Sequence, residues 1–163
     1  MADSFFIHKR EEGSLGLREI KIAIADDSEP IRDLLCLVLS RVEGLNLIGM
    51  AADGVEAIRM IGALHPDVVV LDISMPRKNG IEVLSEIRKE DTSVVIIMFT
   101  ADPSLVLREA CVQAGANFFF AKSEIHEVAR TCRQLLADGV GDSASACGRA
   151  SFGASDAAPA FLS

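Results

Sequence analysis

Apolar residues along the central part of the chain follow two alternating patterns. Short runs rich in Val and Ile are typical of buried strands, and they are separated by longer segments whose apolar residues recur at helical spacing. The five strand candidates are 20–25, 45–51, 68–71, 94–99 and 117–120. Strands that alternate with helices in this way form a parallel sheet with helices on both faces. The pattern therefore predicts a doubly wound α/β fold with a five-stranded parallel sheet.

Three of the strand candidates, 20–25, 68–71 and 94–99, are almost entirely apolar, as strands covered on both faces must be. They should form the centre of the sheet. Helical apolar stripes occupy 31–42 and 125–136, and three further helices are expected at 54–64, 80–89 and 103–114. Asp102 is a candidate N-cap for the last of these three, and Gly115 is a candidate left-handed end.

Composition changes at both ends of this pattern. Residues 139–163 are dominated by Ala, Ser and Gly, which is typical of a disordered tail. We therefore divide the 163-residue chain into an N-terminal extension at 1–18, one folded domain at 19–137 and a tail at 138–163. The apolar residues Phe5, Phe6 and Ile7 could dock on the domain, but a mobile terminus is the commoner outcome.

The charge balance limits the kinds of partner. The chain has 16 basic and 24 acidic residues and a net charge of −8, whereas nucleic acids and anionic membranes are bound through basic surfaces. No apolar run approaches the roughly 18–20 residues that cross a bilayer as a helix. The start of the chain lacks the order of features that marks a secretory signal. We expect a cytoplasmic protein without direct contacts to nucleic acid or membrane, and free thiols at Cys36, Cys111, Cys132 and Cys147.

Polar residues follow the ends of four predicted strands. Asp26 and Asp27 follow the first strand, Asp72 the third, Thr100 the fourth and Lys122 the fifth. Ligands of doubly wound sheets bind outside the carboxyl ends of the strands, so these side chains should converge. Each alone could be a helix cap, a strand-end hydroxyl or a surface charge. Three neighbouring carboxylates, however, repel one another unless a cation offsets them, and hard oxygen ligands suit Mg²⁺.

With these residues the chain resembles the receiver domains of two-component response regulators, which have a (βα)5 flavodoxin-like fold. The family pattern is an acidic pair, an acceptor Asp with Met-Pro and Asn-Gly behind it, Thr-Ala, and finally Gly-Ala, an aromatic residue and Lys. The matching residues occur in the family's order and spacing: Asp26, Asp27, Asp72, Met75, Pro76, Asn79, Gly80, Thr100, Ala101, Gly115, Ala116, Phe119 and Lys122.

The resemblance implies that Asp72 is the phosphoacceptor. The donor would be a sensor histidine kinase, a histidine phosphotransfer protein or a small phosphoryl compound. Asp27 and Asp72 would bind Mg²⁺ directly, helped by the backbone carbonyl of Ser74, and Asp26 would act through a water. Lys122 would pair with one phosphoryl oxygen as a point charge.

The resemblance also implies a switch. Thr100 would hydrogen-bond another phosphoryl oxygen and move toward it, while the aromatic ring of Phe119 turns inward. These movements would alter the face made by the fourth helix, fifth strand and fifth helix, through which a downstream protein would bind. Ser74 and Asp102 border the path of water to the phosphoryl group and would tune its lifetime. Whether two copies form a homodimer stays open.

Two departures from the family pattern matter. Ser123 stands where proline usually follows the lysine, which leaves the loop before the fifth helix undetermined. The residues after 137 are too few and too poor in large apolar side chains to form a DNA-binding domain. We therefore expect a stand-alone response regulator that switches protein–protein interactions and is not an enzyme. The alternative is the receiver half of a transcription factor that lacks its DNA-binding domain.

Two other classes are less favoured. The complete acidic set argues against a receiver-like scaffold that works without phosphate. A phosphatase of the haloacid-dehalogenase type requires a DxDx[TV] motif, and neither Asp26-Asp27-Ser28 nor Asp72-Ile73-Ser74 supplies it.

Overall fold

The computed structural model describes residues 18–140. The tail from 141 onward and all but the last residue of the predicted extension at 1–18 lie outside the described residues. The elements occur in the order β1 (Ile20–Ala25), α1 (Glu29–Leu39), β2 (Leu45–Ala51), α2 (Gly54–Leu64), β3 (Val68–Asp72), α3 (Gly80–Glu90), β4 (Val95–Thr100), α4 (Leu105–Ala114), β5 (Phe118–Ala121), the 3₁₀ turn η1 (Lys122–Glu124) and α5 (Ile125–Asp138).

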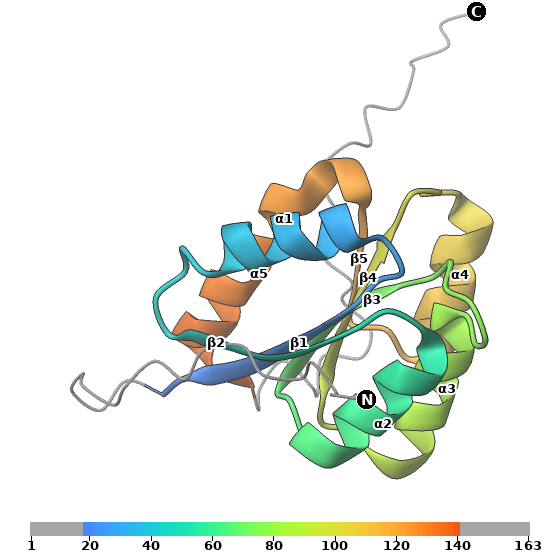
Figure 1. Cartoon of the computed structure of the whole chain (residues 1–163), viewed down its shortest axis with the longest axis horizontal. Coiled ribbons are helices and arrows are strands. Elements are labelled where there is room, and N and C mark those ends of the chain that lie inside the picture. The colour runs from blue at the N-terminus through green and yellow to red at the C-terminus, as the bar shows by residue number, and fades with distance from the viewer. Residues whose placement is uncertain (1–17, 141–163) are drawn as a thin grey trace, which may run out of the picture.

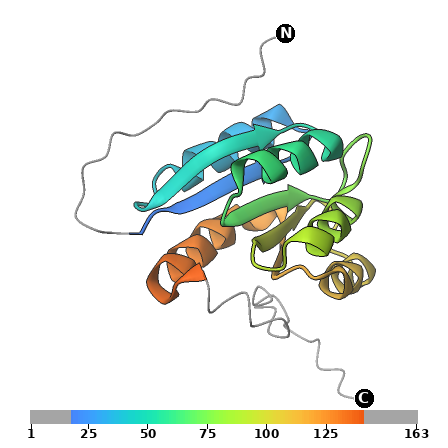
Figure 2. The same ribbon diagram turned by 90° about the horizontal axis from the view of Figure 1, so that it is seen from below.

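The five strands form one parallel sheet in the order β2-β1-β3-β4-β5. Helices α1 and α5 cover one face, and α2, α3 and α4 cover the other (Figure 1). The second view shows the same layers from below (Figure 2). The doubly wound prediction is confirmed, and β1, β3 and β4 occupy the centre as expected. The chain leaves β1 toward β2 on one side and β3 on the other, so the carboxyl ends of β1 and β3 flank a topological switch point.

Successive side chains along each strand lie alternately in two separate apolar layers, as the two-residue period of a strand requires. On β1, Ile22 and Ile24 lie in the layer under α1 and α5, whereas Ala23 and Ala25 lie in the layer under α2 and α3. The layers are continued by β3 and β4, whose residues from Val68 to Leu71 and from Val95 to Phe99 are at most 1% exposed. Burial on both faces explains why these runs are apolar throughout.

The turn from β3 into α3 passes unusually close to the end of β3. A Cβ atom on Gly80 would lie 2.1 Å from the backbone oxygen of Asp72. Asn79 caps α3, because its Oδ1 accepts from the backbone N–H groups of Ile81 and Glu82, both at 3.0 Å. The side chain of Glu82 accepts in return from the N–H of Asn79 at 2.8 Å. The cap and the glycine together fix the first turn of α3 against the carboxyl end of β3.

The predicted start of the fourth helix is wrong. Helix α4 begins at Leu105 with Ser104 as its N-cap, and not at Pro103 behind Asp102. The Ser104 hydroxyl accepts from the N–H of Leu107 at 3.5 Å, while Asp102 accepts from the N–H of Ser104 at 3.1 Å. Asp102 therefore stabilises the turn in front of the helix. The prediction for the other end is confirmed, since Gly115 ends α4 with a φ of +99°.

Other boundaries shift by one to three residues, and α1 covers Glu29–Leu39 where the apolar stripe occupies 31–42. Strands β3, β4 and β5 each end one residue later than predicted, and α5 reaches Asp138. Val140, placed in the tail by composition, is 6% exposed and packs in the layer under α1 and α5. No cis peptide bond occurs in the described part of the chain, and Ser123 lies within η1.

Two expectations from composition can be compared with the described residues. Cys36, Cys111 and Cys132 are free thiols, as predicted, while Cys147 lies outside this part of the chain. Between residues 18 and 140, no helix is long and apolar enough to cross a membrane.

Gly80→Ala should lower the free energy of unfolding by about 2–4 kcal/mol, because the new methyl group would collide with backbone that cannot move independently. Gly62→Ala is the matched control. Gly62 is exposed on α2, and no atom lies within 4 Å of the position that a Cβ would take there. Alanine at 62 should therefore raise stability by about 0.5–1 kcal/mol. Urea unfolding of both variants measures the difference, and equal effects of the two substitutions would contradict the close approach at Gly80.

Candidate functional site

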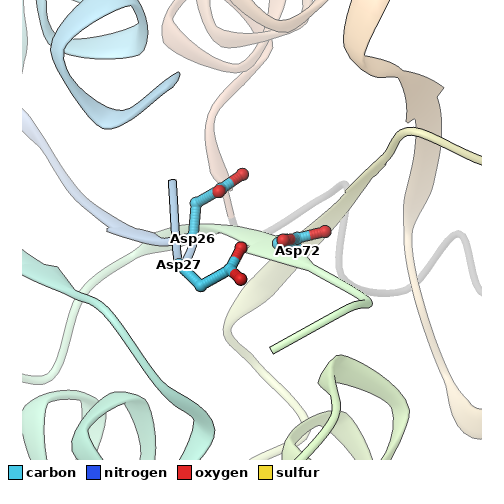
Figure 3. A group of neighbouring side chains, drawn as sticks. All are labelled: Asp26, Asp27 and Asp72. Carbon is cyan, nitrogen blue, oxygen red and sulfur yellow. The ribbon is translucent and has the colours of Figure 1, made fainter. Parts of the chain in front are cut away.

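Three carboxylates meet at the switch point between β1 and β3. Asp26 and Asp27 directly follow β1 and Asp72 ends β3, and one oxygen from each lies within 4.8 Å of the others (Figure 3). Asp26 and Asp72 are 1% and 2% exposed, whereas Asp27 is exposed. Two of the three charges are therefore removed from water, where their mutual repulsion is less well screened.

Lys122 brings a positive charge into this cluster from the opposite side of the sheet centre. It follows β5, and its Nζ lies 2.7 Å from Oδ2 of Asp26 and 3.2 Å from Oδ2 of Asp72. Burial lowers the pKa of Lys122, but the charges of the two carboxylates and their close contacts with Nζ outweigh it, and the pKa is raised. The ammonium group therefore stays charged. One cation faces three carboxylates, so the cluster keeps an excess of negative charge.

The pKa of the Asp72 carboxyl is raised toward neutral pH. Burial and the charge of Asp26 raise its pKa from 3.8 to about 6, although Lys122 and the N–H of Ser74 act in the opposite direction. The Ser74 N–H donates to Oδ1 at 3.2 Å, and Lys122 donates to Oδ2. A carboxylate with this pKa is mostly ionised at neutral pH, which a nucleophile or a metal ligand requires.

Asp26 is anchored at one oxygen and less completely at the other. Its Oδ1 accepts from the N–H of Ser28 at 2.8 Å. Its Oδ2 is buried and faces Lys122 as an ion pair. It accepts no hydrogen bond from the described residues. An incompletely satisfied buried oxygen beside two further carboxylates fits a hydrated divalent cation, which is bound by oxygen atoms and water. The residues present thus fit Mg²⁺.

The remaining predicted residues lie around this cluster. Thr100 ends β4 next to Phe99, which pairs with Asp72 in the β3–β4 ladder, and it is 1% exposed. Its Oγ1 accepts from the N–H of Asp102 at 3.1 Å. Ser74 and Asp102 are exposed. The structure therefore joins Asp26, Asp72 and Lys122 by direct contacts, adds Asp27 at metal-binding distance, and places Thr100 at the end of the neighbouring strand.

Residues 22–131 match the sequence pattern of the response regulator receiver domain family. The chain belongs to this family. Response regulator MprA of Mycobacterium ulcerans is 36% identical to it over 118 residues, which cover 72% of this chain and 50% of that protein. A protein-glutamate methylesterase/protein-glutamine glutaminase of Clostridium acetobutylicum is 32% identical over 110 residues, or 66% of this chain and 32% of that protein. The chain thus spans a third to a half of the length of these curated relatives.

A solved structure supports the same fold. The chain aligns with one from the CheX-CheY-BeF3-Mg²⁺ complex of Borrelia burgdorferi with a TM-score of 0.65 at 30% identity, covering 71% of this chain and 90% of that one. The flavodoxin-like receiver fold expected from the sequence is therefore confirmed.

Two contacts of this receiver domain were not predicted from the sequence. Arg32 on α1 donates from Nη1 to the backbone oxygen of Asp26 at 2.7 Å and so fixes the acidic loop. A cation in the first turn of the helix after an acidic pair is a weak signal that could have indicated it. Arg108 on α4 lies over the ring of Phe119, with its Cζ 5.4 Å from the ring centroid. No motif in the sequence indicates this pairing.

The raised pKa of Asp72 makes stability depend on pH. The folded state binds the proton more tightly than the unfolded chain, so this stabilisation is complete below about pH 4 and is lost as the pH rises through about 6. Asp72→Asn stays neutral and should raise the free energy of unfolding at pH 7.5 by about 1–3 kcal/mol without divalent metal, with no gain near pH 4. Urea unfolding between pH 4 and pH 7.5 measures this change in the free energy of unfolding. Asp33→Asn, at an exposed position, is the control. A gain that is independent of pH would contradict the assignment.

Proposed function

We propose that this chain is a response regulator that accepts a phosphoryl group on Asp72 from a sensor histidine kinase or a histidine phosphotransfer protein. The observation that carries the proposal is the buried Asp72 carboxylate, bound at one oxygen by the Ser74 N–H and at the other by Lys122 within a cluster of three acids. Membership of the receiver family and the relation to response regulator MprA support it.

In the proposed reaction an Asp72 oxygen attacks phosphorus while the bond from phosphorus to the donor's histidine nitrogen breaks. The electron pair of that bond returns to the imidazole ring. Lys122 already contacts Oδ2 of Asp72 and can offset the negative charge that arrives with the phosphoryl group. Thr100, at the adjacent strand end, is the proposed hydrogen-bond donor to a phosphoryl oxygen.

Mg²⁺ is the proposed cofactor. Asp27, Asp72 and the backbone carbonyl of Ser74 would bind it directly, and Asp26, with its incompletely satisfied Oδ2, would bind through a water. When bound, the ion neutralises negative charge on the transferring phosphoryl group. The Borrelia burgdorferi complex contains BeF3 and Mg²⁺, which supports this choice of ion.

The proposed output is a protein–protein interaction through the face formed by α4, β5 and α5, controlled by Thr100 and Phe119. We propose further that the chain is a cytoplasmic signalling protein and not an enzyme. The net charge of −8 argues against direct binding of nucleic acid. The second candidate is the receiver part of a larger regulator, because MprA and the methylesterase are two to three times as long as the region that they share with this chain.

Incubation with acetyl phosphate and Mg²⁺ should add one phosphoryl group to the wild-type chain. Asp72→Asn should abolish the addition, because no other carboxylate of the cluster has both the Ser74 and the Lys122 contacts. Intact mass spectrometry measures the product, and Asp33→Asn, an exposed substitution on α1, should behave like wild type. Uptake by Asp72→Asn at the wild-type rate would refute the acceptor.

Mg²⁺ should raise the melting temperature of the unphosphorylated chain, because binding to the folded state alone stabilises it by about 1.4 kcal/mol at tenfold excess over Kd. Asp27→Ala should remove the response. Its side chain is exposed, so the variant should still fold. NaCl at the same ionic strength controls for simple screening of the carboxylates. A wild-type response to NaCl as large as that to Mg²⁺ would count against a metal site.

Asp102→Asn should change the rate of dephosphorylation and leave the melting temperature unchanged. The amide can still accept from the Ser104 N–H, and Ser104 still caps α4, so only the charge beside the proposed water path is lost. Ser74, two residues after Asp72, borders the same proposed path of water to the phosphoryl group. Decay of the phosphorylated chain, followed by intact mass, gives the lifetime. Identical decay in the variant and the wild type would remove Asp102 from this role.

A further inference from the structure

Helix α4 is weakly attached to the domain. Cys111 is its one buried residue, whereas α3 buries Gly80, Val83, Leu84 and Ile87. Its first two residues, Leu105 and Val106, are 71% and 77% exposed. Elements with few buried apolar contacts have low local stability, so each remaining contact has a larger influence on where α4 lies.

One of those remaining contacts is a cation–π contact between α4 and β5. The guanidinium group of Arg108 lies over the ring of Phe119 at 5.4 Å from its centroid, and the ring is 1% exposed. Arg108 itself is half-buried. A cation over an aromatic face gains more when water is excluded from the pair, and the planar guanidinium suits this geometry. If the ring moved away, the charge would keep its partly buried position and lose this contact.

Phe119 also lies close along the chain to the acidic cluster. It pairs with Met98 in the β4–β5 ladder, and Lys122, which contacts both Asp26 and Asp72, directly follows the end of β5 at Ala121. A change in the position of Lys122 can therefore reach the ring along β5. From the ring, the contact with Arg108 is a direct connection to the middle of α4.

We propose that Arg108 is a positioning residue for the switch: its guanidinium group favours the inward position of the Phe119 ring and couples that position to α4. This inference rests on the proposed phosphoacceptor function and adds to it a residue that sets the balance of the switch. Since phosphorylation is proposed to favour the inward ring, Arg108 and the phosphoryl group stabilise the same arrangement. Removing the guanidinium must then weaken the response to a phosphoryl mimic.

The test uses Arg108→Met, which keeps an apolar stem of similar length and removes the charge, in the full chain. Beryllofluoride with Mg²⁺ serves as the phosphoryl mimic, and ¹⁹F NMR of 4-fluorophenylalanine placed at position 119 reports the environment of the ring. We expect a smaller inward population without the mimic and an apparent affinity for beryllofluoride that falls about threefold to tenfold. Arg130→Met is the matched control, because Arg130 is an exposed α5 residue paired with Glu127, and it should change neither quantity.

A double-mutant cycle separates the contact from a general effect on folding. In a Phe119→Leu background, Arg108→Met should no longer change the affinity for beryllofluoride. A full effect of Arg108→Met in that background, or no effect in the wild-type background, would overturn the inference. The proposed function is judged separately by the wild-type chain. If wild type neither accepts a phosphoryl group from acetyl phosphate nor binds beryllofluoride, it is the proposed function that fails.

Discussion

Repulsion among three carboxylates is the constraint on which the rest of this structure depends. Asp26 and Asp72 are buried, and Asp27 places a third charge within 4.8 Å. Lys122 offsets part of this repulsion, yet burial and the charge of Asp26 still raise the pKa of Asp72 to about 6. The cluster thus costs stability in the absence of a further cation, and a protein retains such an arrangement where function requires it. The proposed affinity for Mg²⁺ would be the direct consequence of that cost.

The fold meets this constraint by holding the acids on its most rigid elements. Asp26 and Asp72 lie at the ends of β1 and β3, which are central strands hydrogen-bonded on both sides. Backbone groups of the following loops bind them, through the N–H groups of Ser28 and Ser74. The carbonyl of Asp72 is in addition confined by the start of α3 at Gly80. The backbone of these elements therefore holds together carboxylates that repel one another.

Much of this can be predicted from the sequence, because apolar runs mark the buried strands and the polar residues behind them mark one edge of the sheet. The apolar pattern ends β3 one residue early, since Asp72 is polar but still belongs to the ladder. It misplaces the start of α4 because Asp102 and Ser104 can both cap a helix, and local sequence does not decide between them. The contact of Arg108 with Phe119 depends on how α4 is rotated on the sheet, which only tertiary packing determines.

The position of β5 has a mechanical consequence. In the described part of the chain β5 is an edge strand, bonded to β4 alone, whereas β3 is bonded to both β1 and β4. Displacing β3 would break two ladders, while a shift of β5 strains one. The proposed phosphorylation site thus lies on β3, which is bonded on both sides, whereas the proposed switch residue Phe119 lies on β5, which is bonded on one side. The proposed acceptor and the proposed switch residue therefore share a sheet but differ in how firmly their strands are held, so a change of charge at Asp72 would be able to move Phe119 without loosening β3.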